Sequence, residues 1–196
     1  MTLRQKTAPL PSLILLLMLN WCGNAHGIIS GSAAEDGEFP WIAGIIKKGN
    51  YPSPALIGGG SLVGDQWVLT AAHSLDSETS GTIEVWIGMN NLSDSASRVV
   101  RNVLAIYRHP DYSSTDGESN NDLALLLLDR PVASVPVIPI LDDPSGISVG
   151  DGMDVAGFGT TSAEVAAASD ILMKAYAEVT PPVQGTRLSP RKIRPK

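Results

Sequence analysis

Short apolar segments bounded by Gly, Pro, Asp or Ser recur along this chain of 196 residues, and no long segment has the apolar periodicity of a helix. About six such segments fall between residues 28 and 142. Many short strands at regular spacing are typical of a closed antiparallel barrel. The sequence therefore predicts an all-β fold, with strands near residues 41–46, 61–63, 66–70, 84–87, 103–107 and 123–128.

Some of these segments carry more specific expectations. Segments 61–63 and 66–70 predict a hairpin about Gly64-Asp65. The continuous apolar run Leu123–Leu128 suits a strand that is buried on both faces. In the later part of the chain, residues 154–159 and 171–179 are predicted to be the first strands of a second, similar barrel. The small residues between them, 163–169, are predicted to form a loop.

One histidine and one aspartate stand where two of these strands end or begin. His73 follows the apolar segment 66–70, and Asp122 lies 49 residues later, directly before Leu123. A buried aspartate usually needs a hydrogen-bonding partner, and a histidine suits it. A histidine whose ring is fixed by an aspartate is a general base near neutral pH. We therefore expect His73 and Asp122 to pair, although the pair by itself lacks a nucleophile.

Residues 1–27 have the features of a secretory signal peptide. The segment begins with Arg4 and Lys6, and its apolar run 13–19 is shorter than the ~20 residues that a membrane-spanning helix needs. A retained membrane anchor is the alternative interpretation. A lipid anchor on Cys22 is disfavoured by the bulky Trp21 before it. We expect a secreted, extracellular protein without stable membrane association.

Composition limits the classes of partner. Removal of residues 1–27 leaves 169 residues without cysteine, enough for one domain or two small ones. Residues 28–186 carry 20 acidic and seven basic side chains, a net charge of −13, which argues against nucleic acid as a partner. The last ten residues, 187–196, carry five basic side chains and no acid. We interpret them as a disordered tail that results from a frame shift, alternative splicing or premature termination. Binding of a polyanion is the alternative interpretation.

An ordered series of short motifs runs along the chain. It comprises Ile28-Ile29-Ser30-Gly31, Phe39-Pro40-Trp41, Gly59-Gly60-Ser61-Leu62, W-V-L-T-A-A-H ending at His73, Val85-Trp86-Ile87-Gly88, His109-Pro110-Asp111-Tyr112, N-D-L-A-L-L-L-L from Asn121, and Gly157-Phe158-Gly159. In this order and spacing the series resembles the trypsin/chymotrypsin-like serine proteases, from Ile28 to about Val183. The family's G-D-S-G-G-P block, which carries its nucleophilic serine, has no counterpart in the 196 residues.

The resemblance implies a two-barrel fold with the active site between the barrels. It implies His73 as general base and Asp122 as its orienting partner, both in the first barrel, and Ile28 as the mature N-terminus. We expect a complete first barrel and a second barrel that is only begun. The domain boundaries that we predict are 1–27 for the leader, 28–145 for the first barrel, 146–186 for the initial strands of the second, and 187–196 for the tail.

The resemblance also marks departures from the family. Gly58 and Ser74 stand where relatives commonly have a disulfide-bonded pair. The α-amino group of Ile28 would pair in the family with an aspartate beside the nucleophile, and that aspartate is missing here, so a loose N-terminus is the favoured interpretation. As alternative nucleophiles we reject both Ser61, in the hairpin that leads to His73, and Ser189, in the tail.

Few other sites are predicted. Asn91-Leu92-Ser93 is an N-glycosylation sequon, with an ordinary turn asparagine as the alternative. A single His73 without a spaced set of oxygen ligands makes no metal site, and no motif indicates a cofactor. The leading interpretation is a secreted trypsin-like serine endopeptidase that acts on polypeptide substrates or meets protease inhibitors, inactive as this truncated chain. The alternatives are a non-catalytic truncated homologue that acts as a binding or decoy protein, and a fragment that results from an incomplete gene model.

The leader gives a testable expectation about processing. Small residues in Ala25-His26-Gly27 favour cleavage before Ile28, and cleavage after Ala25 would leave His26 first. We predict that secreted material begins at Ile28 or His26, which N-terminal sequencing will show. A first residue upstream of Gly23 would contradict the assignment of the leader.

Overall fold

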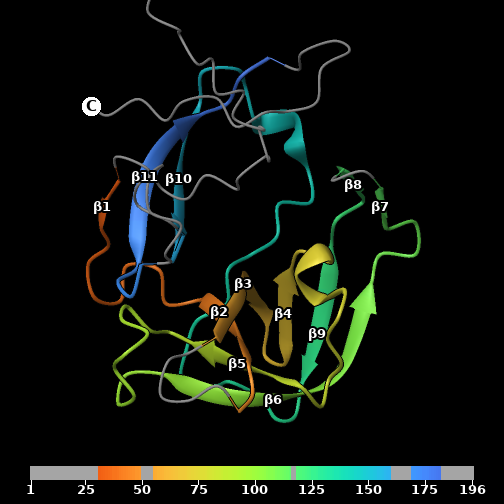
Figure 1. Cartoon of the computed structure of the whole chain (residues 1–196). Coiled ribbons are helices and arrows are strands. Elements are labelled where there is room, and N and C mark those ends of the chain that lie inside the picture. Colours follow the sequence, from red (N-terminus) through yellow and green to blue (C-terminus); the bar gives the residue numbers. More distant parts are fainter. Residues whose placement is uncertain (1–30, 50–54, 116–117, 160–168, 182–196) are drawn as a thin grey trace, which may run out of the picture.

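A computed structural model of the chain describes residues 31–49, 55–115, 118–159 and 169–181 (Figure 1). The described residues form a closed six-stranded barrel, a three-stranded sheet beside it and a short hairpin. This confirms the all-β prediction and the antiparallel barrel of the trypsin-like fold. The predictions for the leader, Ile28, residues 163–168, Ser189 and the tail concern residues outside the described ranges.

Six antiparallel strands close the barrel in the order β2-β3-β4-β9-β6-β5. Each of the expected strands has a counterpart, and closure comes from β2, which pairs with β3 along one edge and with β5 along the other. The barrel strands are β2 (Ile42–Lys47), β3 (Ala55–Gly64), β4 (Trp67–Thr70), β5 (Ile83–Ile87), β6 (Val99–Arg108) and β9 (Ala124–Leu128).

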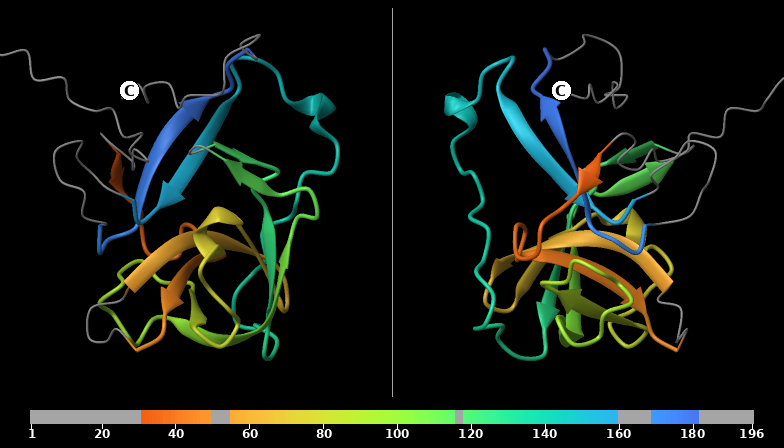
Figure 2. Two further views of the ribbon diagram at one scale, coloured as in Figure 1. Left: turned by 45° about the vertical axis from the view of Figure 1, so that its right-hand side comes forward. Right: turned by 90° about the vertical axis from the view of Figure 1, so that its left-hand side faces the viewer.

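The other strands lie outside the barrel (Figure 2). A sheet in the order β1-β11-β10 contains the two later strands that the sequence predicts and a two-residue strand from the N-terminal side that it does not predict. These are β1 (Ser32–Ala33), β10 (Gly152–Gly157) and β11 (Met173–Glu178); β7 (Ser113–Thr115) pairs with β8 (Glu118–Asn120), and two 3₁₀ turns are η1 (His73–Leu75) and η2 (Pro144–Gly146).

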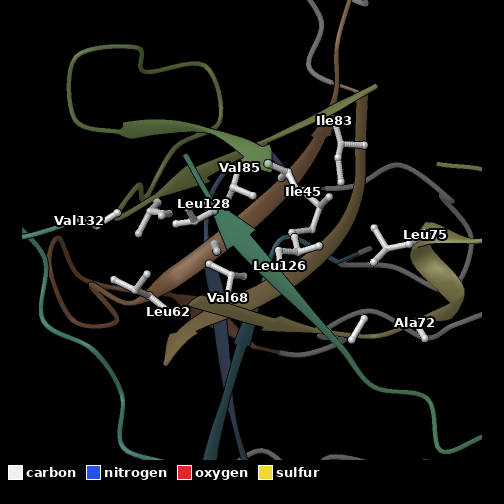
Figure 3. Packing of buried hydrophobic residues seen from close by; sticks show 14 residues of the cluster. Ile45, Leu62, Val68, Ala72, Leu75, Ile83, Val85, Leu126, Leu128 and Val132 are labelled. Carbon is white, nitrogen blue, oxygen red and sulfur yellow. The ribbon is translucent and has the colours of Figure 1, made fainter. Parts of the chain in front are cut away.

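Aliphatic side chains fill the barrel interior (Figure 3). They come from alternate positions of the strands, because successive side chains of a strand point to opposite faces. Each fully buried aliphatic side chain stabilises the fold by about 1.5–3 kcal/mol relative to an exposed one. The cluster includes Ile45, Leu62, Val68, Ile83, Val85, Leu126 and Leu128, each fully buried.

Strand β9 corrects one prediction. The run Leu123–Leu128 was expected to be buried on both faces, but β9 alternates, with Leu126 and Leu128 fully buried and Leu125 and Leu127 partly exposed. Leu123 lies before the strand and is 51% exposed. The reason is that β9 is a barrel wall strand with one face inward, and no described layer covers its outer face completely.

Strand β2, in contrast, is buried on both faces. Its inward residues Ala43 and Ile45 belong to the barrel core, while Ile42 and Ile46 join a second core with Leu172, beside β11. Gly44 permits this approach, because a Cβ there would lie 2.8 Å from the Cε of Met89. The sheet of β1, β11 and β10 therefore packs against the barrel through the outer side of β2.

The hairpin of β3 and β4 is confirmed, with its turn one residue later than predicted. β3 extends through Gly64 because a bulge between Leu62 and Gly64 shifts the register, so Asp65 and Gln66 form the turn. The backbone oxygens of this turn accept hydrogen bonds from Val132 (2.8 Å) and Leu128 (2.9 Å). The end of β9 thus holds the turn in place.

The outer sheet leaves much apolar surface exposed, which predicts self-association. Met153 and Val155 of β10 are 44% and 40% exposed, and Ile140 and Leu141 of the preceding connection exceed half exposure. β10 also has one unpaired edge among the described strands. We expect the purified chain to bind hydrophobic dyes and to self-associate in sedimentation experiments. A monodisperse monomer with a cooperative melt and little dye binding would contradict this expectation.

Candidate functional site

His73 opens the short turn η1, and two residues separate it from Thr70 at the end of strand β4. The end of β4 is fixed by Thr70, whose hydroxyl donates a 2.7 Å hydrogen bond to the backbone oxygen of Gly59. Ala72 and Leu75 on either side of His73 are fully buried in the barrel core. These anchors hold the backbone while the side chain of His73 remains 57% exposed.

Asp122 reaches the same end of the barrel from strand β9. Thr70 and Ala124 are register partners in the antiparallel β4–β9 pair, so the chain leaves β4 where it enters β9. Before Asp122, Asn121 has a φ of 50°, in the left-handed region that asparagine tolerates better than most residues. Its side-chain amide donates a 3.0 Å hydrogen bond to the backbone oxygen of Asp111. This bend directs the chain so that the carboxylate of Asp122 meets His73.

The structure brings His73 and Asp122 into direct contact. The Nδ1 of His73 lies 2.7 Å from Oδ2 of Asp122, and the backbone N–H of His73 donates to Oδ1 at 2.8 Å. Both carboxylate oxygens are therefore used to orient one residue, and the aspartate side chain is 27% exposed. With the carboxylate on Nδ1, the Nε2 nitrogen is left to act on another group.

The electrostatic environment keeps Asp122 ionised. Burial, the largest single influence, would raise the pKa of this carboxyl. The hydrogen bonds from the ring and backbone of His73, the charge of His73 and the backbone N–H of Ala72 act against burial and together hold the pKa of Asp122 below its ordinary value of 3.8. Asp122 is consequently a carboxylate at neutral pH, available to stabilise a protonated His73.

An ion pair between the buried carboxylate of Glu78 and the partly exposed Lys47 fixes the segment that follows His73. Glu78 is 7% exposed, and its carboxylate accepts hydrogen bonds from the Nζ of Lys47 on β2 at 2.6 Å and from the hydroxyl of Thr82 at 2.7 Å. Arg108 of β6 donates to the backbone oxygen of Leu75 in the same segment. Two barrel strands, β2 and β6, thus hold the loop that begins with His73. No sequence pattern gives Glu78 a role, because its partner Lys47 lies 31 residues away.

Tyr112, which follows β6, contacts the residue after the turn η1. Its hydroxyl donates to the carboxylate of Asp76, with distances of 3.0 and 3.1 Å to the two oxygens. Burial, followed by the hydrogen bond to Asp76, raises the pKa of Tyr112. The contact joins the turn η1 to the connection between β6 and β7, and so links the segments on both sides of the His73–Asp122 pair.

Ser74 occupies a position that the sequence analysis considered only for a missing disulfide. An ideal Cβ on Gly58 would lie 2.9 Å from the Cβ of Ser74, so the two positions are in contact, as the resemblance implied. The hydroxyl of Ser74 lies 3.4 Å from Nε2 of His73, the ring nitrogen that Asp122 leaves unused. The adjacency of Ser74 and His73 in the sequence could have raised this contact as a hypothesis, but their relative orientation depends on η1.

The structure places the remaining candidates elsewhere. Ser61 lies within β3, paired with Ile42 and Leu69. Asn91 lies after β5, where its side-chain oxygen accepts from the backbone of Ser93 and its backbone pairs with Ile171. Glycosylation of Asn91 and the catalytic roles of His73 and Asp122 stay predictions.

A metal site, a membrane-spanning helix or a pocket among the described residues would bear on what the chain binds. Among the described residues, no group of three or more His, Cys, Asp or Glu side chains is arranged to hold a metal ion. Within the same ranges, no helix has the length and apolar character needed to cross a bilayer. A pocket between the barrel and the outer sheet contains neither His73 nor Asp122; it is lined by Glu38, Phe39, Trp41, Ile42, Ser61, Ile138, Asp154 and Ala156.

Comparison with known proteins shows the family of this chain. Residues 28–194 match the trypsin family. This chain belongs to the trypsin family of serine proteases. It is 33% identical over 145 residues to complement C1r-B subcomponent of Mus musculus, and 33% identical over 153 residues to complement C1r-A subcomponent of the same organism.

The extent of these matches differs between the chain and its relatives. The two alignments cover 68% and 71% of this chain but 20% of each complement subcomponent, so the chain spans about a fifth of the length of these curated relatives. The match to the trypsin family extends to residue 194, beyond Val183, where the recognisable motifs end. It therefore includes most of the basic segment 187–196.

The Glu78 ion pair gives a prediction with a defined pH dependence. The hydrogen bonds from Lys47 and Thr82 lower the pKa of Glu78 from 4.5, outweighing burial. Its contribution to stability is therefore fully present above pH 4.5 and disappears as the pH falls through the lowered folded-state pKa. Glu78→Gln should lower the free energy of unfolding by about 1–3 kcal/mol at pH 7, because the buried network loses its charge. Urea denaturation followed by tryptophan fluorescence measures this.

A matched substitution separates the ion pair from a general charge effect. Glu178→Gln, at an exposed position on β11, removes the same charge and should change stability by less than about 0.5 kcal/mol. The difference between the two variants should vanish at acidic pH, where Glu78 is protonated in the folded state. Equal effects of the two substitutions at pH 7 would show that the Lys47–Glu78 contact does not stabilise the loop.

Proposed function

We propose that this chain carries the general base and its orienting carboxylate for a secreted, extracellular serine endopeptidase of the trypsin family. The observation that supports this most directly is the double contact of Asp122 with His73, through Nδ1 and through the backbone N–H. In a hydrolase of this type, Nε2 of the histidine takes the proton of a nucleophilic serine and later delivers it to the leaving amine. Asp122 fixes the tautomer and stabilises the imidazolium.

The proposal includes a nucleophile that the 196 residues do not supply. The sequence contains no G-D-S-G-G-P block, and Ser61 is held within β3. We infer that the 196 residues by themselves do not hydrolyse peptide bonds, and that a serine and oxyanion-stabilising groups must come from sequence of the second-barrel type. Polypeptides are the substrates that this activity requires, and protease inhibitors of the family are further partners.

A second candidate is a non-catalytic homologue that binds proteases, substrates or inhibitors. The exposed apolar surface of β10 favours this alternative, because such surface commonly marks a protein-binding site. It predicts that no added segment restores hydrolysis. We favour the endopeptidase because the His73–Asp122 geometry is fully formed in the first barrel, whereas a binding protein has no need of it.

The test is complementation with the missing catalytic groups. The chain beginning at Ile28 is co-expressed with the G-D-S-G-G-P-bearing half of a related trypsin-family protease, and hydrolysis of a panel of fluorogenic peptide amides is measured. We expect hydrolysis by the pair and none above background by either part alone. Asp122→Asn should lower kcat of the pair by about 10⁴-fold, because the wrong tautomer of His73 is then stabilised.

Two outcomes would contradict the proposal. Peptide hydrolysis by the 196 residues alone, abolished by His73→Ala, would show that a nucleophile is present. A stable complex of the two parts that hydrolyses no peptide in the panel would favour the binding protein. Tyr107→Phe, an exposed barrel position on β6, serves as the control substitution and should leave hydrolysis unchanged.

A further inference from the structure

Three side chains of the described chain lie in the order hydroxyl, imidazole and carboxylate. The hydroxyl oxygen of Ser74 is 3.4 Å from Nε2 of His73, and Nδ1 of the same ring is 2.7 Å from Asp122. A hydroxyl beside a histidine that is oriented by a third group is the arrangement in which a general base activates a nucleophile. The 3.4 Å separation is longer than an ideal hydrogen bond, as such contacts often are without a bound substrate.

The surroundings of Ser74 leave room for this hydroxyl. Position 58 is glycine, and a Cβ there would lie 2.8 Å from the Ser74 hydroxyl oxygen, so even alanine would press on it. Ser74 is partly exposed, and the His73 side chain is 57% exposed. The oxygen therefore sits at the rim of the barrel, next to a ring that faces solvent.

We propose that Ser74 is an acyl-acceptor site, activated by His73 and Asp122, whose substrates are activated aryl esters. The Ser74 oxygen attacks the ester carbonyl carbon while its proton passes to Nε2 of His73. The bond from the carbonyl carbon to the aryl oxygen then breaks, the phenolate leaves, and His73 returns the proton to solvent. The products are an ester on Ser74 and a free phenolate.

The same observations limit the reaction to a single, slow acylation. Oxyanion-stabilising groups usually supply a large part of the rate of acyl transfer, and we assign none among the described residues around Ser74. An aryl ester has a good leaving group and tolerates this loss, whereas a peptide does not. Acylation of Ser74 by an aryl ester therefore needs only residues that the chain contains, and it does not require the 196 residues to hydrolyse peptides.

The experiment uses the full chain and p-nitrophenyl acetate. Release of p-nitrophenolate is followed by absorbance, and the acetylated residue is located by peptide mass spectrometry. We expect up to one acetyl group per chain, on Ser74. Ser74→Ala should abolish this modification, and His73→Ala should slow it by about 100-fold or more, as loss of a general base does. Ser113→Ala, at an exposed serine on β7, is the matched control and should not change it.

Two further variants separate activation from simple exposure of the hydroxyl. Gly58→Ala leaves His73 and Asp122 untouched but should displace the Ser74 side chain and slow acetylation, and Asp122→Asn should slow it through His73. Circular dichroism establishes that each variant keeps the barrel. Acetylation of Ser74 at the same rate in His73→Ala, or acetyl groups spread evenly over exposed serines, would overturn the proposal. Failure of complementation with a second-barrel half would leave this result unaffected, since no added segment takes part.

Discussion

Closure of the barrel depends on β2, which pairs with β3 along one edge and with β5 along the other. Closure removes the free edges of six strands at once and encloses a continuous aliphatic core. The same strand carries the second core on its outer side, where Ile42 and Ile46 pack with Leu172. One strand buried on both faces therefore joins the barrel to the outer sheet, and Gly44 leaves room for Met89 of the second core.

The contact between His73 and Asp122 also depends on this barrel. Closure places β4 beside β9, so the segments that carry His73 and Asp122 meet at one end of the barrel. The pairing of β4 with β9 does not by itself fix the 2.7 Å distance between Nδ1 of His73 and Oδ2 of Asp122. The left-handed backbone of Asn121 orients the segment that carries Asp122, and the ion pair of Glu78 with Lys47 holds the loop that begins with His73. Together they favour the hydrogen bond between Asp122 and Nδ1 of His73. The family membership of the chain and this geometry both support the proposal that His73 acts as a general base.

Sequence patterns anticipated the strands better than their surroundings. Alternation and turn residues located the barrel strands, because both act over a few neighbouring residues. The burial of β9 on both faces was predicted wrongly, since an apolar run records hydrophobicity and not which layers cover it. The two-residue strand β1 and the polar hairpin of β7 and β8 carry too little local signal to be recognised.

The sequence by itself determined the all-β class, the membership of the trypsin family and the identity of His73 and Asp122 as partners, because these follow from short motifs in a fixed order. The tertiary structure alone decided that β2 is the strand buried on both faces, that Lys47 neutralises Glu78, and that the Ser74 hydroxyl lies beside Nε2 of His73. Each of these depends on distance and orientation, including contacts between residues far apart in the chain, and such geometry exists only once the barrel has closed.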